Sequence, residues 1–201
     1  MADLFETQAE IYAKIRPKYP RGVVRSTRRP HPTSRRGLAD HYDRVVATDV
    51  SEGQLKQAAP HPKIRYLHTP ISMPEDDLVA LLGGESSVDL VTVATAVHWF
   101  DLQKFYPVVE RVLRKPGGVV AVWSYGLIRV CPSFDPIVRR FVDTTLPFCN
   151  PNIRLVAEEY RSLPFPFDSV GVGAEGQPVA LEMKTEASFE GILQLMRSWS
   201  P

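Results

Sequence analysis

An aspartate at the end of a short strand pattern is the first side chain whose position suggests chemistry. Asp49 follows residues 44–48, RVVAT, which are typical of a buried strand. It precedes Ser51 and Gln54, whose spacing is that of a capping box and predicts the start of a helix. In nucleotide-binding α/β sheets an acid at this place holds a ribose diol. Aspartates here also serve only as caps or turn residues, so both interpretations stay open.

Six arginines gather in residues 21–36, RGVVRSTRRPHPTSRR, which contain no acid. Without these six arginines, the chain has 18 of its 24 Lys and Arg residues and 23 acidic residues, which gives a net charge of −5. The segment therefore differs in composition from the rest of the chain. Arginine clusters bind phosphates without sequence specificity. No stacking aromatic or recognition-helix pattern accompanies them, and we do not expect nucleic-acid binding. The prolines predict a disordered basic insert over 21–38.

The number of cysteines and the composition argue against several classes of protein, namely metal-binding, membrane-spanning and secreted proteins. Cys131 and Cys149 are the two cysteines and lack paired-ligand spacing, so we expect no metal site and a reducing compartment. No apolar run is long enough to cross a bilayer, and the start of the chain lacks a signal pattern. We therefore expect a cytoplasmic protein without a membrane partner; the sequence leaves the oligomeric state open.

Residues 88–123 carry the clearest secondary-structure pattern. The run 88–97 predicts a buried strand, and Asp101 can cap a helix with apolar residues at helical spacing. Pro116-Gly117-Gly118 is expected to stop that helix, and 119–123 to form a second strand. Pro107 predicts a kink or a restart within the helix. Strand, helix and strand make a βαβ unit, so the fold class is α/β.

Further elements complete the predicted order. A strand at 64–68 and a helix with acidic residues 75–77 in its first turn precede the segment 88–123. After residue 125, proline-punctuated segments predict shorter pieces. These are a helix with Ile137, Val138, Phe141 and Val142 as core contacts, a helix within 155–163, a strand at 179–183, and a helix at 188–199 with Phe189, Ile192, Leu193 and Met196 on its inner side.

Four segments together resemble class I S-adenosylmethionine-dependent methyltransferases. The nearest branch is the type 11 group, similar to trans-aconitate methyltransferase and its plant relatives. The segments are FETQAEIYAKIRPKYP (5–20), VVATDVS (45–51), DLVTVATAVHWFD (89–101) and RVLRKPGGVVAVW (111–123). The resemblance implies a Rossmann-like, doubly wound, mostly parallel sheet, here incomplete, that binds S-adenosyl-L-methionine. It also implies one truncated domain: an N-terminal lid helix (1–20), the basic insert (21–38), an α/β core (39–125) and a partial substrate-side region (126–201).

The resemblance also assigns roles by position. Asp49 would bind the ribose hydroxyls, and small residues at the end of strand 88–97 would leave room for the sulfonium. The implied donor residues are Asp49, Thr69, Pro70, Ile71, Ala94, Thr95 and Ala96. The implied acceptor residues are Tyr12, Arg16 and Tyr19 of the lid, with Trp99 and His98 in the pocket.

The reaction implied by the resemblance needs little from the protein. A sulfonium methyl is already activated, so alignment and a dry pocket are the main requirements. Arg16 could pair with an acidic small-molecule acceptor. His98 could be a base where the acceptor must lose a proton, or a hydrogen-bonded packing histidine beside Trp99.

One segment departs from the family pattern. The glycine-rich turn, of D-x-G-x-G-x-G type, should lie between Pro20 and His41, where the arginine segment stands instead. The interval is roughly 15 residues too short for a strand, turn and helix. A frame-shifted or mis-spliced product and a divergent isoform both account for this, and the end at Pro201 also falls short of the family. We expect this chain to bind the methyl donor poorly or not at all.

The sequence therefore leaves three hypotheses about function. The first is methyl transfer to a small-molecule acceptor such as a carboxylate, impaired in this chain. The second is a non-catalytic remnant or isoform that acts as an interaction module. The third, a nicotinamide-binding protein, fits less well because the same glycine pattern is missing and the HWFD and KPGG segments do not match it.

Overall fold

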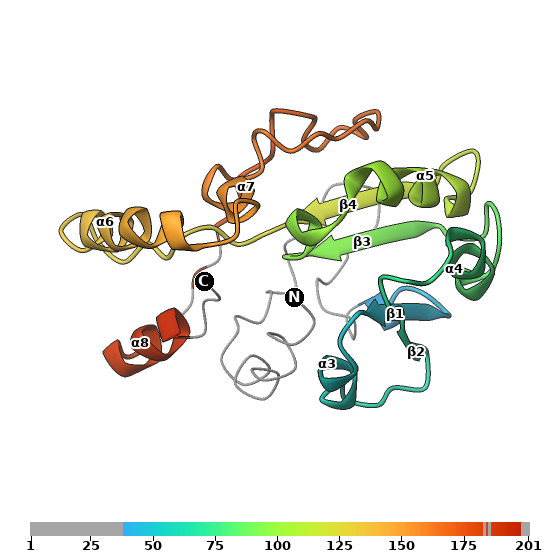
Figure 1. Ribbon diagram of the computed structural model, residues 1–201, viewed down its shortest axis with the longest axis horizontal. Coiled ribbons are helices and arrows are strands. Elements are labelled where there is room, and N and C mark those ends of the chain that lie inside the picture. Colours follow the sequence, from blue (N-terminus) through green and yellow to red (C-terminus); the bar gives the residue numbers. More distant parts are fainter. Residues whose placement is uncertain (1–37, 183, 185, 198–201) are drawn as a thin grey trace. The chain divides into compact units, whose positions relative to one another are not determined.

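The computed structural model describes residues 38–182, 184 and 186–197 (Figure 1). The predicted lid helix and the arginine segment lie outside these residues, as do Tyr12, Arg16 and Tyr19. The chain divides into two compact units. The described part of the first consists of 38–74 with 180–182, 184 and 186–197, and the second is 75–179.

A parallel strand pair forms the first unit's sheet. β1 (Val45–Asp49) pairs with β2 (Ile64–His68), with Val45 opposite Ile64 and Asp49 opposite His68. The short helix α3 (Glu52–Lys56) lies between them in sequence. Ala39, Val45, Ala47 and Ile64 are buried together, and removing these apolar side chains from water stabilises the pair. The prediction of β2 is confirmed residue for residue, and that of β1 to within one residue.

A second parallel pair forms the sheet of the second unit (Figure 1). β3 (Leu90–Ala94) pairs with β4 (Val119–Trp123), with Leu90 opposite Val119. The 3₁₀ helix η1 (Val97–Trp99) and the helix α5 (Leu102–Val112) connect the two strands. Each strand pair thus has a helical crossover, which is the βαβ unit of a Rossmann-like α/β fold.

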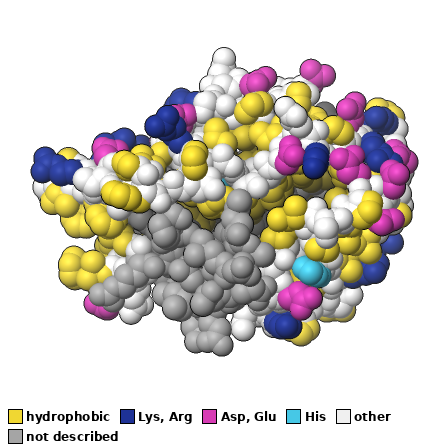
Figure 2. All heavy atoms as spheres, in the orientation of Figure 1, with side chains coloured by type: hydrophobic (Ala, Val, Ile, Leu, Met, Phe, Trp, Pro, Cys, Tyr) yellow, Lys and Arg dark blue, Asp and Glu magenta, His cyan; other side chains and the backbone are white. Residues whose placement is uncertain are grey.

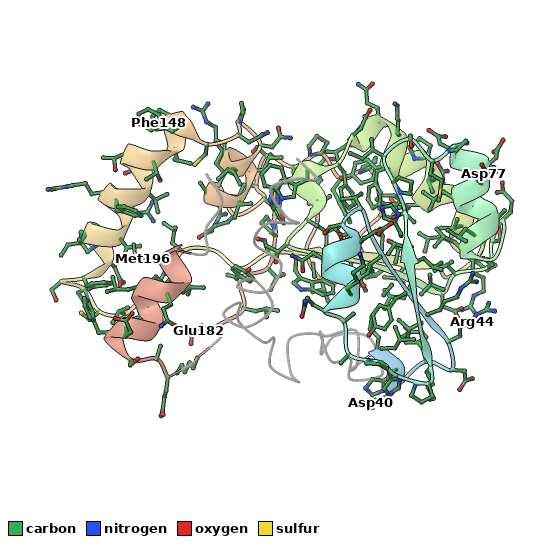
Figure 3. All side chains as sticks on the ribbon, turned by 60° about the horizontal axis from the view of Figure 1, so that its bottom comes forward. Asp40, Arg44, Asp77, Phe148, Glu182 and Met196 are labelled. Atoms are coloured by element: carbon green, nitrogen blue, oxygen red, sulfur yellow. The ribbon has the colours of Figure 1, made fainter. Side chains whose placement is uncertain are left out.

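Helix α4 (Glu75–Leu82) packs with α5. Val79 of α4 is buried with Val108 and Val112 of α5, and Val91 of β3 packs against this cluster. The acidic first turn predicted for α4 is present, and Asp77 lies exposed at that end (Figure 3). The arrangement buries the apolar stripes of both helices.

The expected single sheet is present as two separate pairs. Among the described residues, β1 pairs only with β2, and β3 only with β4. The segment in which the resemblance implies a first strand lies outside the described residues. Within the part of the chain that the structure describes, β1 and β3 therefore each have a ladder partner on one side alone.

The expected end of α5 is wrong, and one of the two alternatives at Pro107 is excluded. The helix runs continuously through Pro107, so it does not restart there. Proline removes one backbone donor, and the buried face of Tyr106, Val108 and Val109 outweighs that loss. The helix also ends at Val112 rather than at Pro116. Arg114 instead donates its amide to the Val88 carbonyl at 2.9 Å, so the chain turns early to pair beside β3.

The elements after residue 125 agree only in part with the predictions. Helix α6 (Asp135–Thr145) buries Val138 and Val142, but Ile137 and Phe141 are exposed, so only half of the predicted stripe is core. Hydrophobic side chains reach the surface over α6 in Figure 2. The 3₁₀ helix η2 (Leu146–Phe148) follows, and Phe148 points outward (Figure 3).

The remaining predictions for this region are met in part. Helix α7 (Ile153–Ala157) replaces the longer helix expected within 155–163. The expected strand at 179–183 is wrong for its described residues, which are irregular and include exposed Val179 and Leu181. They lack a strand partner, which any ladder requires. Helix α8 (Phe189–Arg197) is present, but Phe189 is exposed rather than on an inner face.

Candidate functional site

Asp49 is the last residue of β1 and organises the turn that follows. Its Oδ1 accepts a hydrogen bond from the Ser51 amide at 3.0 Å. The buried Ser51 hydroxyl in turn accepts from the Gln54 amide at 3.1 Å, which caps α3. The prediction that Ser51 caps a helix is confirmed. The carboxylate therefore has a structural role, and its half-buried position at the carboxyl end of a parallel strand is also where α/β sheets bind ligands.

Residues 69–71 continue from the neighbouring strand. The Thr69 amide donates to the Asp49 carbonyl at 3.0 Å, so the structure brings Asp49 and Thr69 together. Pro70 is half-buried, and the Ile71 side chain is 82% exposed. An exposed isoleucine at the strand end is an apolar surface on which a flat ring could lie.

The segment Ala94–Ala96 ends β3 in an unusual conformation. Thr95 has a φ of 54°, which is rare for a β-branched residue. Its amide donates to the Trp123 carbonyl at 2.8 Å, which fixes this turn against β4. Ala94 is exposed and Ala96 is half-buried. Strained backbone of this kind clusters at functional sites, and the small side chains leave the backbone accessible.

His98 is buried in η1 and has a specific partner. Its Nδ1 lies 2.9 Å from the Tyr160 hydroxyl oxygen, and its ring centroid lies 4.8 Å from that of Trp99. The side chain is only 4% exposed, within reach of the apolar cluster formed by Val93, Val97 and Leu163. This environment is that of a hydrogen-bonded core histidine.

Tyr160 is a residue that the sequence analysis missed. It lies 62 residues from His98 and follows α7 in sequence. A buried histidine requires a hydrogen-bond partner, and this requirement was the available signal for a distant hydroxyl. No local periodicity distinguishes Tyr160 from the other tyrosines.

A second buried tyrosine lies in the same unit. The Tyr106 hydroxyl donates to the Pro164 carbonyl, and its ring contacts those of Phe165 and Phe167 edge-on. Burial, with a smaller effect from the Glu175 carboxylate, raises the pKa of Tyr106 to about 12. Tyr106 stays protonated at neutral pH and joins α5 to the segment 164–167.

Metal ligands and membrane spans are not found among the described residues. No group of three or more His, Cys, Asp or Glu side chains there could hold a metal ion. No helix in the same ranges combines the length and the apolar character needed to cross a bilayer.

Comparison with known proteins finds similarity to methyltransferases. Residues 33–122 match a family described as a methyltransferase domain. A methyltransferase of Dictyostelium discoideum is 35% identical over 98 residues, which are 49% of this chain and 34% of that protein. An S-adenosylmethionine-dependent methyltransferase of Saccharomyces cerevisiae is 28% identical over 131 residues, 57% of this chain and 44% of that protein.

A solved structure agrees with these sequence relatives. The chain is 32% identical to a type II methyltransferase from Anaeromyxobacter dehalogenans, with a TM-score of 0.53 over 84% of this chain and 66% of the other. The chain spans less than half of the length of the two relatives matched by sequence.

Proposed function

Because the chain is related to class I S-adenosylmethionine-dependent methyltransferases, we propose that it derives from an enzyme that methylates a small acceptor bearing a carboxylate. The observation that carries the proposal is the family match over residues 33–122, which spans both βαβ units except for Trp123, the last residue of β4. Within the family we place it in the type 11 branch, similar to trans-aconitate methyltransferase.

Each unit contains described residues that are suited to one portion of S-adenosyl-L-methionine. In the first, the Asp49 carboxylate is suited to a ribose diol, and Thr69, Pro70 and Ile71 to the adenine. In the second, Ala94, Thr95 and Ala96 offer short side chains and accessible backbone for the methionine portion. When bound, this cofactor supplies an activated methyl group.

The acceptor residues of the second unit are His98 and Trp99. A carboxylate is already ionised at neutral pH, so its methylation needs alignment and exclusion of water more than a base. We propose that Trp99 and the buried His98 beside it face the acceptor, as the resemblance implies. The resemblance adds Tyr12, Arg16 and Tyr19 as proposed acceptor residues, with Arg16 able to pair with the carboxylate.

We further propose that donor binding is impaired in this chain. Six arginines occupy residues 21–36, where the family has a glycine-rich turn whose amides hold the donor's methionine end. Each lost hydrogen bond to a charged group weakens binding by about 1.5–3 kcal/mol. Loss of several such contacts moves a micromolar affinity into the millimolar range or beyond.

The test compares the chain with a restored variant. In the variant, a designed strand, D-x-G-x-G-x-G turn and helix replaces residues 21–36. We expect calorimetric titration with S-adenosylmethionine to give no saturable heat for the chain and micromolar binding for the variant. Micromolar binding by the unaltered chain would refute the impairment. A folded variant that still shows no binding of S-adenosylmethionine would refute the methyltransferase assignment.

A non-catalytic interaction module is the second candidate, favoured by the arginine segment itself. Its charge would attract polyanions, and retention would fall with added salt in proportion to the phosphates contacted. Salt-sensitive retention on immobilised nucleic acid, lost when all six arginines are replaced by glutamine, supports this function. Thermal stabilisation by the methyl donor supports the enzyme instead.

A further inference from the structure

Two exposed arginines of the second unit share one carboxylate. Arg161 Nη2 lies 2.8 Å from Glu159 Oε2, and Arg129 Nη2 lies 3.7 Å from Glu159 Oε1. Among the residues that the structure describes, neither guanidinium pairs with another carboxylate. One carboxylate therefore lies between two guanidinium groups, with one of them at each of its oxygens. The pair brings two positive charges to one negative charge.

Two segments bring these side chains together. Arg129 lies in the segment that follows β4, whereas Glu159 and Arg161 lie in the turn that follows α7. Helix α7 packs against η1, which follows the carboxyl end of β3 (Figure 1). The hydroxyl oxygen of Tyr160, which lies between the two charged residues of the turn, is 2.9 Å from His98 Nδ1. The charged side chains thus come from segments that follow the carboxyl ends of parallel strands, where α/β sheets bind ligands.

The backbone that carries the carboxylate has an unfavourable conformation. Glu159 and Tyr160 have φ values of 56° and 60°, two consecutive non-glycine residues in the left-handed region. The Tyr160 amide donates to the Leu155 carbonyl at 2.8 Å, which fixes the turn to α7. Glycine or asparagine would adopt this φ more readily than glutamate. The turn therefore presents the carboxylate at a conformational cost, and strain of this kind clusters at ligand-binding sites.

The carboxylate is held weakly enough for a ligand to displace it. The side chains of Arg129, Glu159 and Arg161 are 77%, 46% and 62% exposed. Ion pairs at this exposure contribute little stability, because water competes for both charges. A ligand with a carboxylate for each guanidinium would replace one shared group with two, and guanidinium–carboxylate contacts are strong hydrogen bonds.

We propose that Arg129 and Arg161 form a carboxylate-binding site in which Glu159 is the internal occupant. Resting on the proposed function, this site receives a carboxylate of the acceptor, and the two arginines determine the specificity for an anionic acceptor. The Glu159 side chain leaves when the ligand enters. It therefore competes with the ligand and lowers the apparent affinity of the site.

Site-resolved NMR of the ¹⁵N-labelled full chain tests the proposal, with succinate as the probe and without a methyl donor. The Nε resonances of the two arginines are assigned through their loss in Arg129→Gln and Arg161→Gln. At low ionic strength, we expect succinate to shift both resonances saturably with one dissociation constant. Arg161→Gln should weaken the response of Arg129 about three- to tenfold. Arg154→Gln, which removes an exposed arginine of α7, should leave that response unchanged.

Glu159→Gln is the decisive variant, because it removes the internal occupant. It should tighten succinate binding about two- to tenfold. Glu158→Gln is its matched control, since it removes the same charge from the preceding residue, whose carboxylate accepts from the Ser162 hydroxyl rather than from an arginine. It should change the dissociation constant little.

Two outcomes overturn the proposal. One is the absence of saturable shifts at Arg129 and Arg161 in the unaltered chain. The other is equal tightening by Glu158→Gln and Glu159→Gln, because net charge alone would then account for it. Since S-adenosylmethionine takes no part in the titration, succinate binding at the two arginines and donor binding by the restored variant can each fail without the other.

Discussion

The Thr69 amide donates to the Asp49 carbonyl at 3.0 Å, so the β1–β2 ladder continues one residue past its last paired strand residues. This bond fixes the main chain of Asp49 while its carboxylate accepts from Ser51. The two residues assigned to a nucleoside by resemblance therefore form one hydrogen-bonded corner of the first unit.

Replacing Asp49 should separate its structural role from its proposed binding role. Asp49→Ala leaves the Ser51 amide without its acceptor and should lower the free energy of unfolding by about 1 kcal/mol. Asp49→Asn keeps an acceptor oxygen and should lose less. Both should weaken donor binding in the restored variant. Equal destabilisation in thermal melts would show that the hydrogen bond from Ser51 is not what the carboxylate contributes.

Gly118 is required by the turn before β4. A Cβ there would lie 2.7 Å from the Arg114 carbonyl oxygen and 2.9 Å from Leu113 Cβ. Gly118→Ala should lower the free energy of unfolding by about 2–4 kcal/mol, measured by urea unfolding. Gly126→Ala is the control, since a Cβ there meets no atom within 4 Å. Similar losses in both variants would contradict the proposed close approach.

Replacing Thr95 with a residue that tolerates positive φ should make the protein more stable. Thr95→Asn should raise the free energy of unfolding by about 0.5–1 kcal/mol, because asparagine adopts positive φ more readily. Thr92→Asn, within β3, should instead be destabilising because asparagine is a poor strand former. Thermal melts check both; a destabilised Thr95→Asn would show that the Thr95 side chain outweighs the strain.

Tyr106 should make stability fall at alkaline pH. Unfolded tyrosine loses its proton near pH 10, whereas folded Tyr106 keeps it until about pH 12. Unfolding therefore releases a proton within this window, and its free energy should fall by about 1.4 kcal/mol per pH unit. Below pH 10 the full stabilisation that protonated Tyr106 gives to the folded state is present.

Tyr106→Phe supplies the comparison for that window. The variant loses the hydrogen bond to Pro164 but also loses the titration, so its stability should decline less steeply between pH 10 and 12. Urea unfolding at several pH values measures the difference. Parallel pH profiles would mean that the buried hydroxyl does not cause the decline.

Cys131 should react faster with alkylating reagents than Cys149. It is exposed, and the Ser133 hydroxyl, with the Phe134 amide, lowers the pKa of its thiol. Ser133→Ala should slow alkylation of Cys131 several-fold at neutral pH, as followed by mass spectrometry. Cys149 serves as the internal reference, and a rate unchanged by the substitution would remove Ser133 as the cause.

Short-range patterns predicted the local elements well. The strands at 64–68 and 119–123 are confirmed, as are the Ser51 and Asp101 caps and the acidic first turn of α4. These features depend on residues within a few positions of one another, so periodicity and capping preferences are sufficient to find them.

Burial after residue 125 was harder to predict. Ile137 and Phe141 share a helical stripe with Val138 and Val142, yet only the two valines are buried. Periodicity identifies the apolar face of a helix. How much of that face is buried depends on neighbours that are distant in sequence. The same reason accounts for the exposed Phe189 of α8.

The sequence alone determined the fold class, the βαβ unit at 88–123 and the resemblance to methyltransferases, because these follow from local patterns and from motifs of contiguous residues. Only the tertiary structure decided that α5 stops where Arg114 pairs with Val88, and that Tyr160 is the partner of His98. Both are contacts between segments far apart along the chain, and such pairings are selected by packing and by the need of buried polar groups for partners.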